Sequence, residues 1–259
     1  MGGLNTYRVD AVVLRTRELN EGNRLLILYS RAHGKIRALA YGAAKPGSRK
    51  RGAVQPFCYS DFLLSRGREW DTVRQAQTRE MFMRLRDDLD LLGYASHFSE
   101  LVDLFTPVGE PNEPLFRLLL RGLGLLGTVD AELLARSFEL RALACLGYRP
   151  ELERCASCGG RAGEGPPAFD PAAGGVLCRD CAGAFPPGRR PPEVAAQALA
   201  VMRSLTRLDP ARVGLLQVPA RTRTEIKNIL RGFWEYHLER RSRSLGFLEE
   251  LGRKGPAGR

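Results

Sequence analysis

Two Cys-x-x-Cys pairs carry the clearest chemistry in this sequence. Cys155 and Cys158 form the first pair, Cys178 and Cys181 form the second, and 19 residues separate the pairs. This spacing is typical of four-cysteine zinc sites, in which two tight turns each supply two thiolates to one tetrahedral ion. Two disulfides, a redox-active dithiol or an iron–sulfur cluster are the alternatives. Four cysteines leave no ligand position for water, so we expect one structural Zn²⁺ per chain rather than a catalytic one.

The chain between the two pairs supports a metal. Residues 159–177 contain many glycines and prolines, and such a short, broken stretch cannot bury a hydrophobic core of its own. We therefore expect the metal to be the main source of order in this segment.

A cluster of basic residues is the second feature of the sequence that could carry chemistry. The densest cluster is in residues 45–52, a polar connector that we expect to be a flexible loop between strands, and further cations lie close by in sequence. Such a loop, beside strands that offer aromatic rings, suits single-stranded nucleic acid, although a solvated run of charges is the alternative. The candidate DNA-binding residues here are Arg24, Lys35, Arg37, Lys45, Arg49, Lys50 and Arg51.

A second basic cluster closes the last expected helix. It consists of Arg240, Arg241 and Arg243, which are further DNA-binding candidates. Cations also stabilise the C-terminal end of any helix, so this cluster has two interpretations.

The charge balance agrees with a polyanionic partner. The chain carries 40 basic and 29 acidic residues, a formal charge of +11. The excess is concentrated in residues 1–80, with 15 basic against 7 acidic residues, and in residues 221–259, with 10 against 5. Nucleic acid or an anionic membrane surface fits this balance. Because no apolar run approaches the ~18 residues of a membrane span, we expect a cytoplasmic protein. The preference for arginine over lysine also fits a coding bias.

Catalytic motifs are not evident in the sequence. It contains no H-E-x-x-H, no G-x-x-x-x-G-K-[ST] and no zinc-deaminase pattern. We therefore expect no enzymatic activity and no catalytic residues.

The elements that position these residues change in type along the chain. Five β-like runs occupy residues 7–14, 24–29, 35–41, 54–64 and 70–77. Five short strands with one long basic connector favour a small barrel of the OB type, while an SH3-like barrel or a sandwich fragment would show a similar pattern.

From residue 79 onward the apolar residues recur at helical spacing. We expect helical segments at 82–105, 115–126, 132–146, 194–208 and 225–238, so the cysteine segment interrupts a helical bundle. The predicted fold class is α+β with three parts. Residues 1–80 form an OB-type domain, residues 81–154 and 182–259 form a helical domain, and residues 155–181 form a zinc ribbon inserted into it.

The order of these parts resembles the RecO family of recombination mediators. The N-terminal resemblance rests on residues 10–17, 21–26, 33–37 and 55–57. The remainder rests on Arg136–Arg141, Leu146–Tyr148, the first cysteine pair, and Gly174–Gly175 before the second pair. Together these blocks cover nearly the whole chain.

The resemblance implies a function that composition alone does not give. It implies binding of single- and double-stranded DNA, annealing of complementary strands, and work with RecR to load recombinase during DNA recombination and repair after DNA damage. It also implies contact with single-strand-binding protein, in the bacterial cytoplasm and at the nucleoid during repair. The alternatives from other classes are a zinc-dependent nucleic-acid enzyme and a zinc-ribbon assembly factor of transcription or ribosomes.

Overall fold

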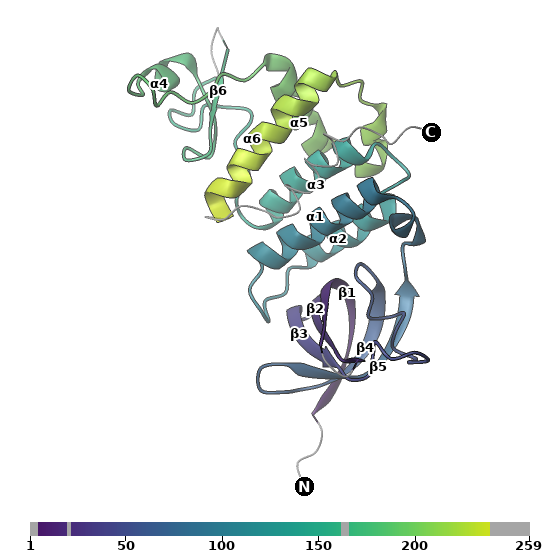
Figure 1. Ribbon diagram of the computed structural model, residues 1–259. Coiled ribbons are helices and arrows are strands. Elements are labelled where there is room, and N and C mark those ends of the chain that lie inside the picture. The colour runs from purple at the N-terminus through teal and green to yellow at the C-terminus, as the bar shows by residue number, and fades with distance from the viewer. Residues whose placement is uncertain (1–4, 20–21, 162–165, 239–259) are drawn as a thin grey trace. The chain divides into compact units, whose positions relative to one another are not determined.

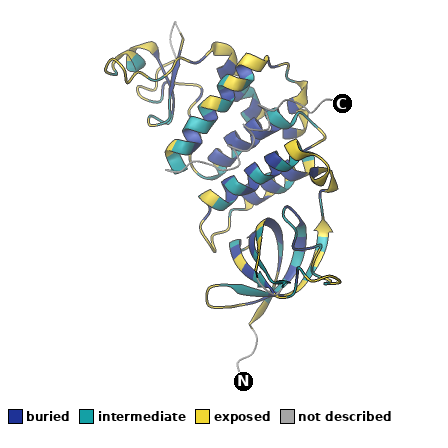
Figure 2. Ribbon diagram, in the orientation of Figure 1, coloured by how far each residue is buried: buried dark blue, intermediate teal, exposed yellow. Residues whose placement is uncertain are grey.

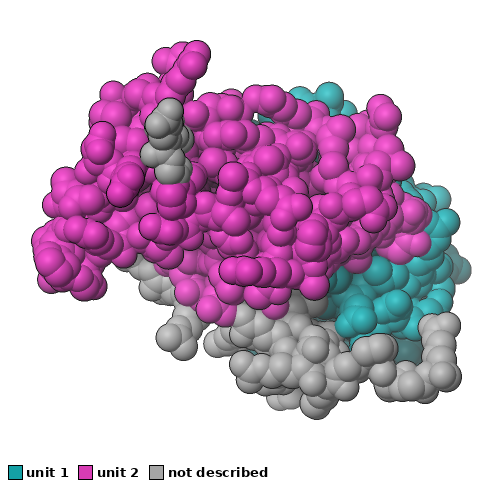
Figure 3. Space-filling view, turned by 90° about the horizontal axis from the view of Figure 1, so that it is seen from above, with its two compact units in different colours: residues 1–126, 243–259 teal, residues 127–242 magenta. Residues whose placement is uncertain are grey.

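A computed structural model describes residues 5–19, 22–161 and 166–238 of the chain. Its elements run from a β-rich N-terminal part through helices to the cysteine segment and back to helices (Figure 1). The described residues divide into two compact units, the first ending at Leu126 and the second beginning at Gly127 (Figure 3). The three-domain division expected from the sequence remains a prediction.

The first unit contains the predicted OB-type barrel. Its strands are β1 (Thr6–Glu18), β2 (Arg24–Ser30), β3 (Gly34–Ala40), β4 (Tyr59–Ser65) and β5 (Asp71–Glu80). They pair in the order β1-β2-β3-β5-β4, and β4 pairs again with β1. All pairings are antiparallel except the one between β3 and β5. That parallel seam is only two residue pairs long, Ala38 with Asp71 and Leu39 with Thr72.

Strand β1 is long enough to serve two neighbours. Its first half pairs with β4 from Thr6 to Val12, and its second half pairs with β2 from Ala11 to Glu18, with a register shift after Val13. A bulge of this kind bends a strand and increases its twist, which helps a sheet to curl into a barrel.

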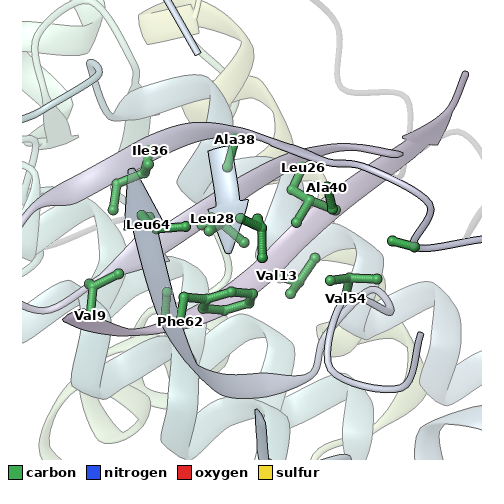
Figure 4. Close-up of a cluster of buried hydrophobic side chains, with 13 residues drawn as sticks. Val9, Val13, Leu26, Leu28, Ile36, Ala38, Ala40, Val54, Phe62 and Leu64 are labelled. Carbon is green, nitrogen blue, oxygen red and sulfur yellow. The ribbon is translucent and has the colours of Figure 1, made fainter. Parts of the chain in front are cut away.

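Alternation along the strands builds the barrel core. Every second residue points inward, so that Val9, Ala11 and Val13 of β1 are all buried while exposed Arg8 lies between inward neighbours. Figure 4 shows Val9 and Val13 converging with side chains of the other strands, such as Leu28 and Phe62. The same cluster includes Val54, which lies outside the strands.

The connector between β3 and β4 differs from the expected flexible loop. It is a succession of hydrogen-bonded turns, and its Ala43 and Val54 are buried in the barrel core. The fourth strand, expected to begin at residue 54, begins at Tyr59. The backbone turns at Phe57, which has a φ of 66°, and this conformation ends a strand.

Two helices complete the first unit, α1 (Leu89–Phe105) and α2 (Glu113–Leu125). Their N-terminal N–H groups are capped by the side chains of Asp88 and Asn112. The helical spacing expected from residue 82 is broken before α1, where a short 3₁₀ helix, η2 (Met83–Arg86), precedes the cap. Apolar spacing alone does not distinguish these two helix types.

The second unit is built on three helices, α3 (Ala131–Cys145), α5 (Ala196–Arg207) and α6 (Ala220–Leu238), with a 3₁₀ helix η3 (Pro210–Leu215) between the last two. Helix α3 packs against both α5 and α6, and it is buried along most of its length (Figure 2). Among the described helices, none is both long and apolar enough to cross a membrane.

The cysteine segment lies between α3 and α5. It contains a two-stranded sheet, β6 (Ala168–Asp170) with β7 (Gly175–Leu177), followed by the short helix α4 (Arg179–Gly183). Its own core is small, because the buried residues of this cluster are Cys155, Leu177 and Cys178.

Candidate metal centre and nucleic-acid interface

The four cysteines predicted as metal ligands converge on one point. All four sulfur atoms lie within 4.8 Å of one another, and the sulfurs of Cys158 and Cys178 are 3.9 Å apart. A tetrahedral ion with Zn–S distances of about 2.3 Å requires sulfurs separated by roughly 3.8 Å. All six cysteines of the chain are free thiols, so the disulfide alternative finds no support.

Local backbone geometry creates this convergence. The first pair sits on a tight knuckle, in which the Cys155 N–H donates to the Gly160 carbonyl at 2.8 Å and the Gly159 N–H donates back to the Cys155 carbonyl at 2.8 Å. The second pair is placed by α4, because Cys178 precedes this helix and Cys181 lies one turn further on. A hydrogen bond from Ala156 N–H to the Val176 carbonyl, 2.7 Å long, joins the two knuckles.

The acidity of the thiols is typical of a ligand set. Burial raises the pKa of Cys155, but hydrogen bonds from the backbone N–H groups of Cys158, Cys178 and Ser157 outweigh it and lower the pKa to about 6. These bonds stabilise a thiolate.

Cys181 shows the opposite shift. Its bond with Ser157 lowers the pKa, but its interactions with the other three cysteines raise it to about 12. Four thiolates at this spacing repel one another and need a cation to coexist. The cluster therefore fits a metal ion held by four sulfurs.

Two of the predicted DNA-binding residues, Arg49 and Lys50, line a groove in the first unit. The groove has a volume of about 860 Å³ and is lined by residues of β1, β4, β5 and the turned connector. Four of its cations, Arg8, Arg49, Lys50 and Arg74, form no ion pair with any carboxylate in the described part of the chain.

The carboxylates in the groove are already engaged. Asp61 accepts hydrogen bonds from Arg79 through both of its oxygens, each at 2.7 Å. The Tyr59 hydroxyl donates to Asp10 at 2.8 Å and accepts from Arg79 at 3.0 Å. Arg79 is therefore paired with Asp61, and the other four cations outnumber the one remaining carboxylate, Asp10, so the groove keeps a net positive charge.

The pKa of Lys50 shows the effect of this positive charge. Burial lowers the pKa of its ammonium group, and the nearby charge of Arg74 lowers it further. Its nearest recorded partner is the Val73 carbonyl at 3.4 Å, a weak acceptor contact. An anion in the groove would relieve this repulsion, and a phosphate is the anion that Arg and Lys bind most readily in nucleic acid.

The other predicted DNA-binding residues are dispersed. Arg37, Lys45 and Arg51 are exposed but do not line the groove. The side chain of Arg24 is only 14% exposed and lies 4.0 Å from Glu18.

Lys35 is also held inside the protein, because its ammonium group contacts the carbonyl of Asp103 at 2.5 Å and the carboxylate at 3.2 Å. Because this ammonium group already has two acceptors, it is less available to bind a phosphate. Arg240, Arg241 and Arg243 lie outside the described residues.

Sequence reasoning missed Arg8 and Arg74. Both were visible as outward-facing residues next to buried partners, Val9 in β1 and Val73 in β5. Attention to cation clusters in sequence passed over them, because single arginines on two strands come together only when those strands flank β4.

A second cavity lies in the second unit and has a volume of about 620 Å³. Its lining residues include the apolar Leu140 and Leu152. They also include five arginines and two glutamates: Arg141, Arg149, Arg154, Arg203, Arg207, Glu151 and Glu153. Glu153 is held by Arg207 at 2.6 Å and by Arg203 at 3.3 Å. The cavity therefore combines apolar residues with an excess of positive charge.

Fold and site define the class of protein. An OB-type barrel with a basic groove, helices, and a cluster of four cysteines that could hold a metal ion make up a modular α+β protein. Two family models cover it in sequence: the recombination protein O N-terminal model matches residues 4–82, and the C-terminal model matches residues 86–246.

Similar curated proteins are all named DNA repair protein RecO. The protein from Pelotomaculum thermopropionicum is 51% identical over 98% of both chains. Those from Desulforamulus reducens and Desulforudis audaxviator are 40% and 43% identical, over 96% of this chain and 96% and 98% of their own. The chain belongs to the RecO family, a family of DNA repair proteins.

Proposed function

We propose that this protein is a non-catalytic recombination mediator that binds single- and double-stranded DNA and anneals complementary strands. The observation that carries the proposal is the groove of the barrel, where four cations without acidic partners among the described residues face solvent. OB-type barrels commonly present such surfaces to nucleic acid.

Annealing then follows from electrostatics. Two complementary strands repel each other through their phosphates, and a basic protein surface that neutralises phosphates lowers this repulsion. Base pairing supplies the free energy, so neither ATP nor an added divalent metal is required. The second basic region expected from the sequence, residues 221–243, would contact the other strand or the duplex product.

The four cysteines would hold one Zn²⁺ per chain, and Cys155, Cys158, Cys178 and Cys181 are its proposed ligands. A closed four-sulfur set stabilises the fold and leaves no coordination site for a substrate. We therefore propose a structural role for the zinc, and we favour a mediator over a zinc-dependent enzyme.

Two protein partners belong to the proposal. Family membership supports RecR, with which the protein would help to load recombinase, and single-strand-binding protein, whose tail is acidic. The arginine-lined cavity of the second unit offers a suitable surface for an acidic tail with apolar side chains. These partners place the proposed activity in the bacterial cytoplasm, at the nucleoid during repair.

An annealing assay tests the central claim. Labelled complementary oligonucleotides are mixed with the protein without ATP or divalent metal, over a range of salt concentrations. We expect acceleration over spontaneous annealing that is greatest at low salt and declines as ionic strength rises. The double variant Arg8→Glu with Arg74→Glu should lose most of this acceleration, whereas Arg212→Glu, an exposed arginine of η3, should retain it. A nucleotide requirement, or strand cleavage that persists through repurification, would contradict the proposal.

A further inference from the structure

A line of aromatic rings runs from the core of the second unit to its surface. Phe169 of β6 packs edge-on against Phe233 of α6, with ring centroids 5.7 Å apart. Phe233 in turn packs against His237, one helical turn further on, at 4.5 Å. His237 then contacts two tyrosines, Tyr148 at 4.7 Å and Tyr236 at 5.2 Å.

The two ends of this line differ in exposure. Phe169 and Phe233 are buried, at 2% and 1% exposed. Tyr148 and Tyr236 are 42% and 54% exposed. A tyrosine packed only for stability would hide more of its ring, because the ring is the part whose burial is favourable.

The backbone at Tyr148 is fixed by hydrogen bonds at the end of α3. Helix α3 ends in a hydrogen-bonded cap in which the Tyr148 N–H donates to the Leu143 carbonyl at 2.8 Å and the Gly147 N–H donates to the Ala144 carbonyl at 3.3 Å. Gly147 adopts a φ of 87°, as such caps require. A fixed backbone lowers the entropy lost when the ring binds a ligand.

We propose that the exposed rings of Tyr148 and Tyr236, with His237 between them, form a stacking platform for unpaired nucleobases of single-stranded nucleic acid. This inference rests on the proposed function, because it assigns a second contact for the DNA that the barrel groove would bind through phosphates.

Charge and chemistry favour this ligand over others. Residues 221–259, which include α6, carry 10 basic and 5 acidic residues, so the platform belongs to a part of the chain that attracts a polyanion. Arg149, which is exposed, follows Tyr148 directly in the chain. Flat aromatic faces beside cations are the elements with which proteins hold single strands without reading their sequence. Duplex DNA binds such rings poorly, because its bases are already stacked on one another.

Two oligonucleotides separate stacking from phosphate binding. The affinity of the full-length protein is measured for a 30-nucleotide thymidine strand and for a strand of equal length and charge whose bases are replaced by abasic sites. The variant Tyr148→Ala with Tyr236→Ala should bind the thymidine strand about tenfold more weakly than the unaltered protein does, and should bind the abasic strand equally well.

Two controls test whether the rings act by stacking. The double Phe variant, Tyr148→Phe with Tyr236→Phe, keeps the rings and should bind thymidine normally. Leu215→Ala removes an apolar side chain of η3 that is 68% exposed and should have no effect on either strand. Thermal unfolding of each variant checks that the fold is intact, and the Phe variant remains informative if the Ala variant unfolds.

Several outcomes would overturn the platform. These are unchanged binding of thymidine by a folded Ala variant, an equal loss on the abasic strand, or loss of thymidine binding in the Phe variant. Self-association of the unaltered protein that the Ala variant abolishes, without a change in DNA affinity, would assign the rings to contact between copies of the chain. In each case, if the unaltered protein binds both strands, the proposed function still stands. If the unaltered protein binds neither strand, the proposed function itself is refuted.

Discussion

Asp130 shows how much one side chain contributes in the second unit. Its carboxylate caps α3 by accepting from the Leu133 N–H at 2.9 Å, and it forms a two-point ion pair with Arg223 of α6, with distances of 2.8 and 3.0 Å. Burial raises the pKa of this carboxyl, but the hydrogen bonds from Arg223 and the Leu133 N–H outweigh burial and lower it.

This lowered pKa predicts a pH dependence of stability. Because the folded-state pKa is below the unfolded value of about 3.9, Asp130 stabilises the fold above that value and loses its contribution as pH falls through the folded-state pKa. Asp130→Asn keeps a capping oxygen but removes the charge. We expect it to lower the free energy of unfolding by about 1 kcal/mol at pH 7 and by progressively less in acid. Denaturant unfolding between pH 2 and 7 checks this.

The control for Asp130 is an exposed ion pair. Glu113 and Arg117 of α2 form one at 2.7 Å, with side chains 46% and 72% exposed. Glu113→Gln should change stability by less than about 0.5 kcal/mol at every pH. If the two variants behave alike, the Asp130 pair is only a surface pair.

Gly34 illustrates a second residue-scale constraint. It adopts a φ of 59° at the start of β3, and a Cβ placed there would lie 1.9 Å from the carbonyl oxygen of Glu110. Gly147 has a φ of 87° but open space around it. Gly147→Ala should therefore cost about 1 kcal/mol of stability through backbone strain alone, and Gly34→Ala about 3 kcal/mol or more because the backbone must also move. Comparable losses in the two variants, measured by denaturant unfolding, would contradict this distinction.

At the scale of elements, strands β1 and β5 contribute to the positive charge of the groove in the barrel. Their outward-facing arginines, Arg8 and Arg74, line this groove together with the connector cations Arg49 and Lys50. If the groove binds DNA through phosphates, each neutralised cation should remove a fixed part of the salt dependence. We expect Arg8→Gln and Arg74→Gln each to reduce the slope of log affinity against log salt by about 0.7 on single strands.

Comparison variants make that measurement specific. Arg37, on β3, is exposed but outside the groove, and Arg212, on η3, lies in the other unit. Arg212→Gln should leave the slope unchanged. A reduction for Arg37→Gln as large as for Arg8→Gln would show that the DNA-binding surface extends around the barrel and is not confined to the groove.

At the scale of the whole molecule, the barrel and the cysteine segment differ in the size of their hydrophobic cores. The barrel has an extended hydrophobic core, whereas the cysteine segment has three buried residues in its own cluster, and we have proposed that a metal stabilises it. Metal removal should therefore affect the two regions very differently. After treatment with a strong chelator, we expect amide hydrogen exchange to rise sharply in residues 151–161 and 166–185 and to remain unchanged in strands β1–β5.

A cysteine variant provides the matched test of that expectation. Cys155→Ser should lose the single equivalent of zinc and show the same local increase in exchange, while Cys145→Ser, a half-buried thiol of α3 outside the cluster, should keep its zinc. Retention of zinc by Cys155→Ser, or a uniform rise in exchange across the barrel, would contradict a local structural role for the metal.

The sequence by itself determined most of the elements and the four cysteines of the candidate metal cluster. Strands with alternating apolar residues and helices with three-to-four-residue spacing follow from local periodicity, and each of the five strands was expected close to its observed place. The cysteine cluster was equally predictable. Its cysteines come in pairs with two residues between them, so that short turns impose most of the geometry.

Only the tertiary structure decided which cations act together. Lys35 and Arg24 appeared available in the sequence, yet packing turns one toward Asp103 and the other toward Glu18, while Arg8 and Arg74 meet across strands. Tyr148, which follows the end of α3, likewise contacts His237 of α6, the residue next to Tyr236. Local patterns fix what a residue's own element does, but a surface formed by residues far apart in the chain depends on strand order and helix packing, which no short stretch of sequence encodes.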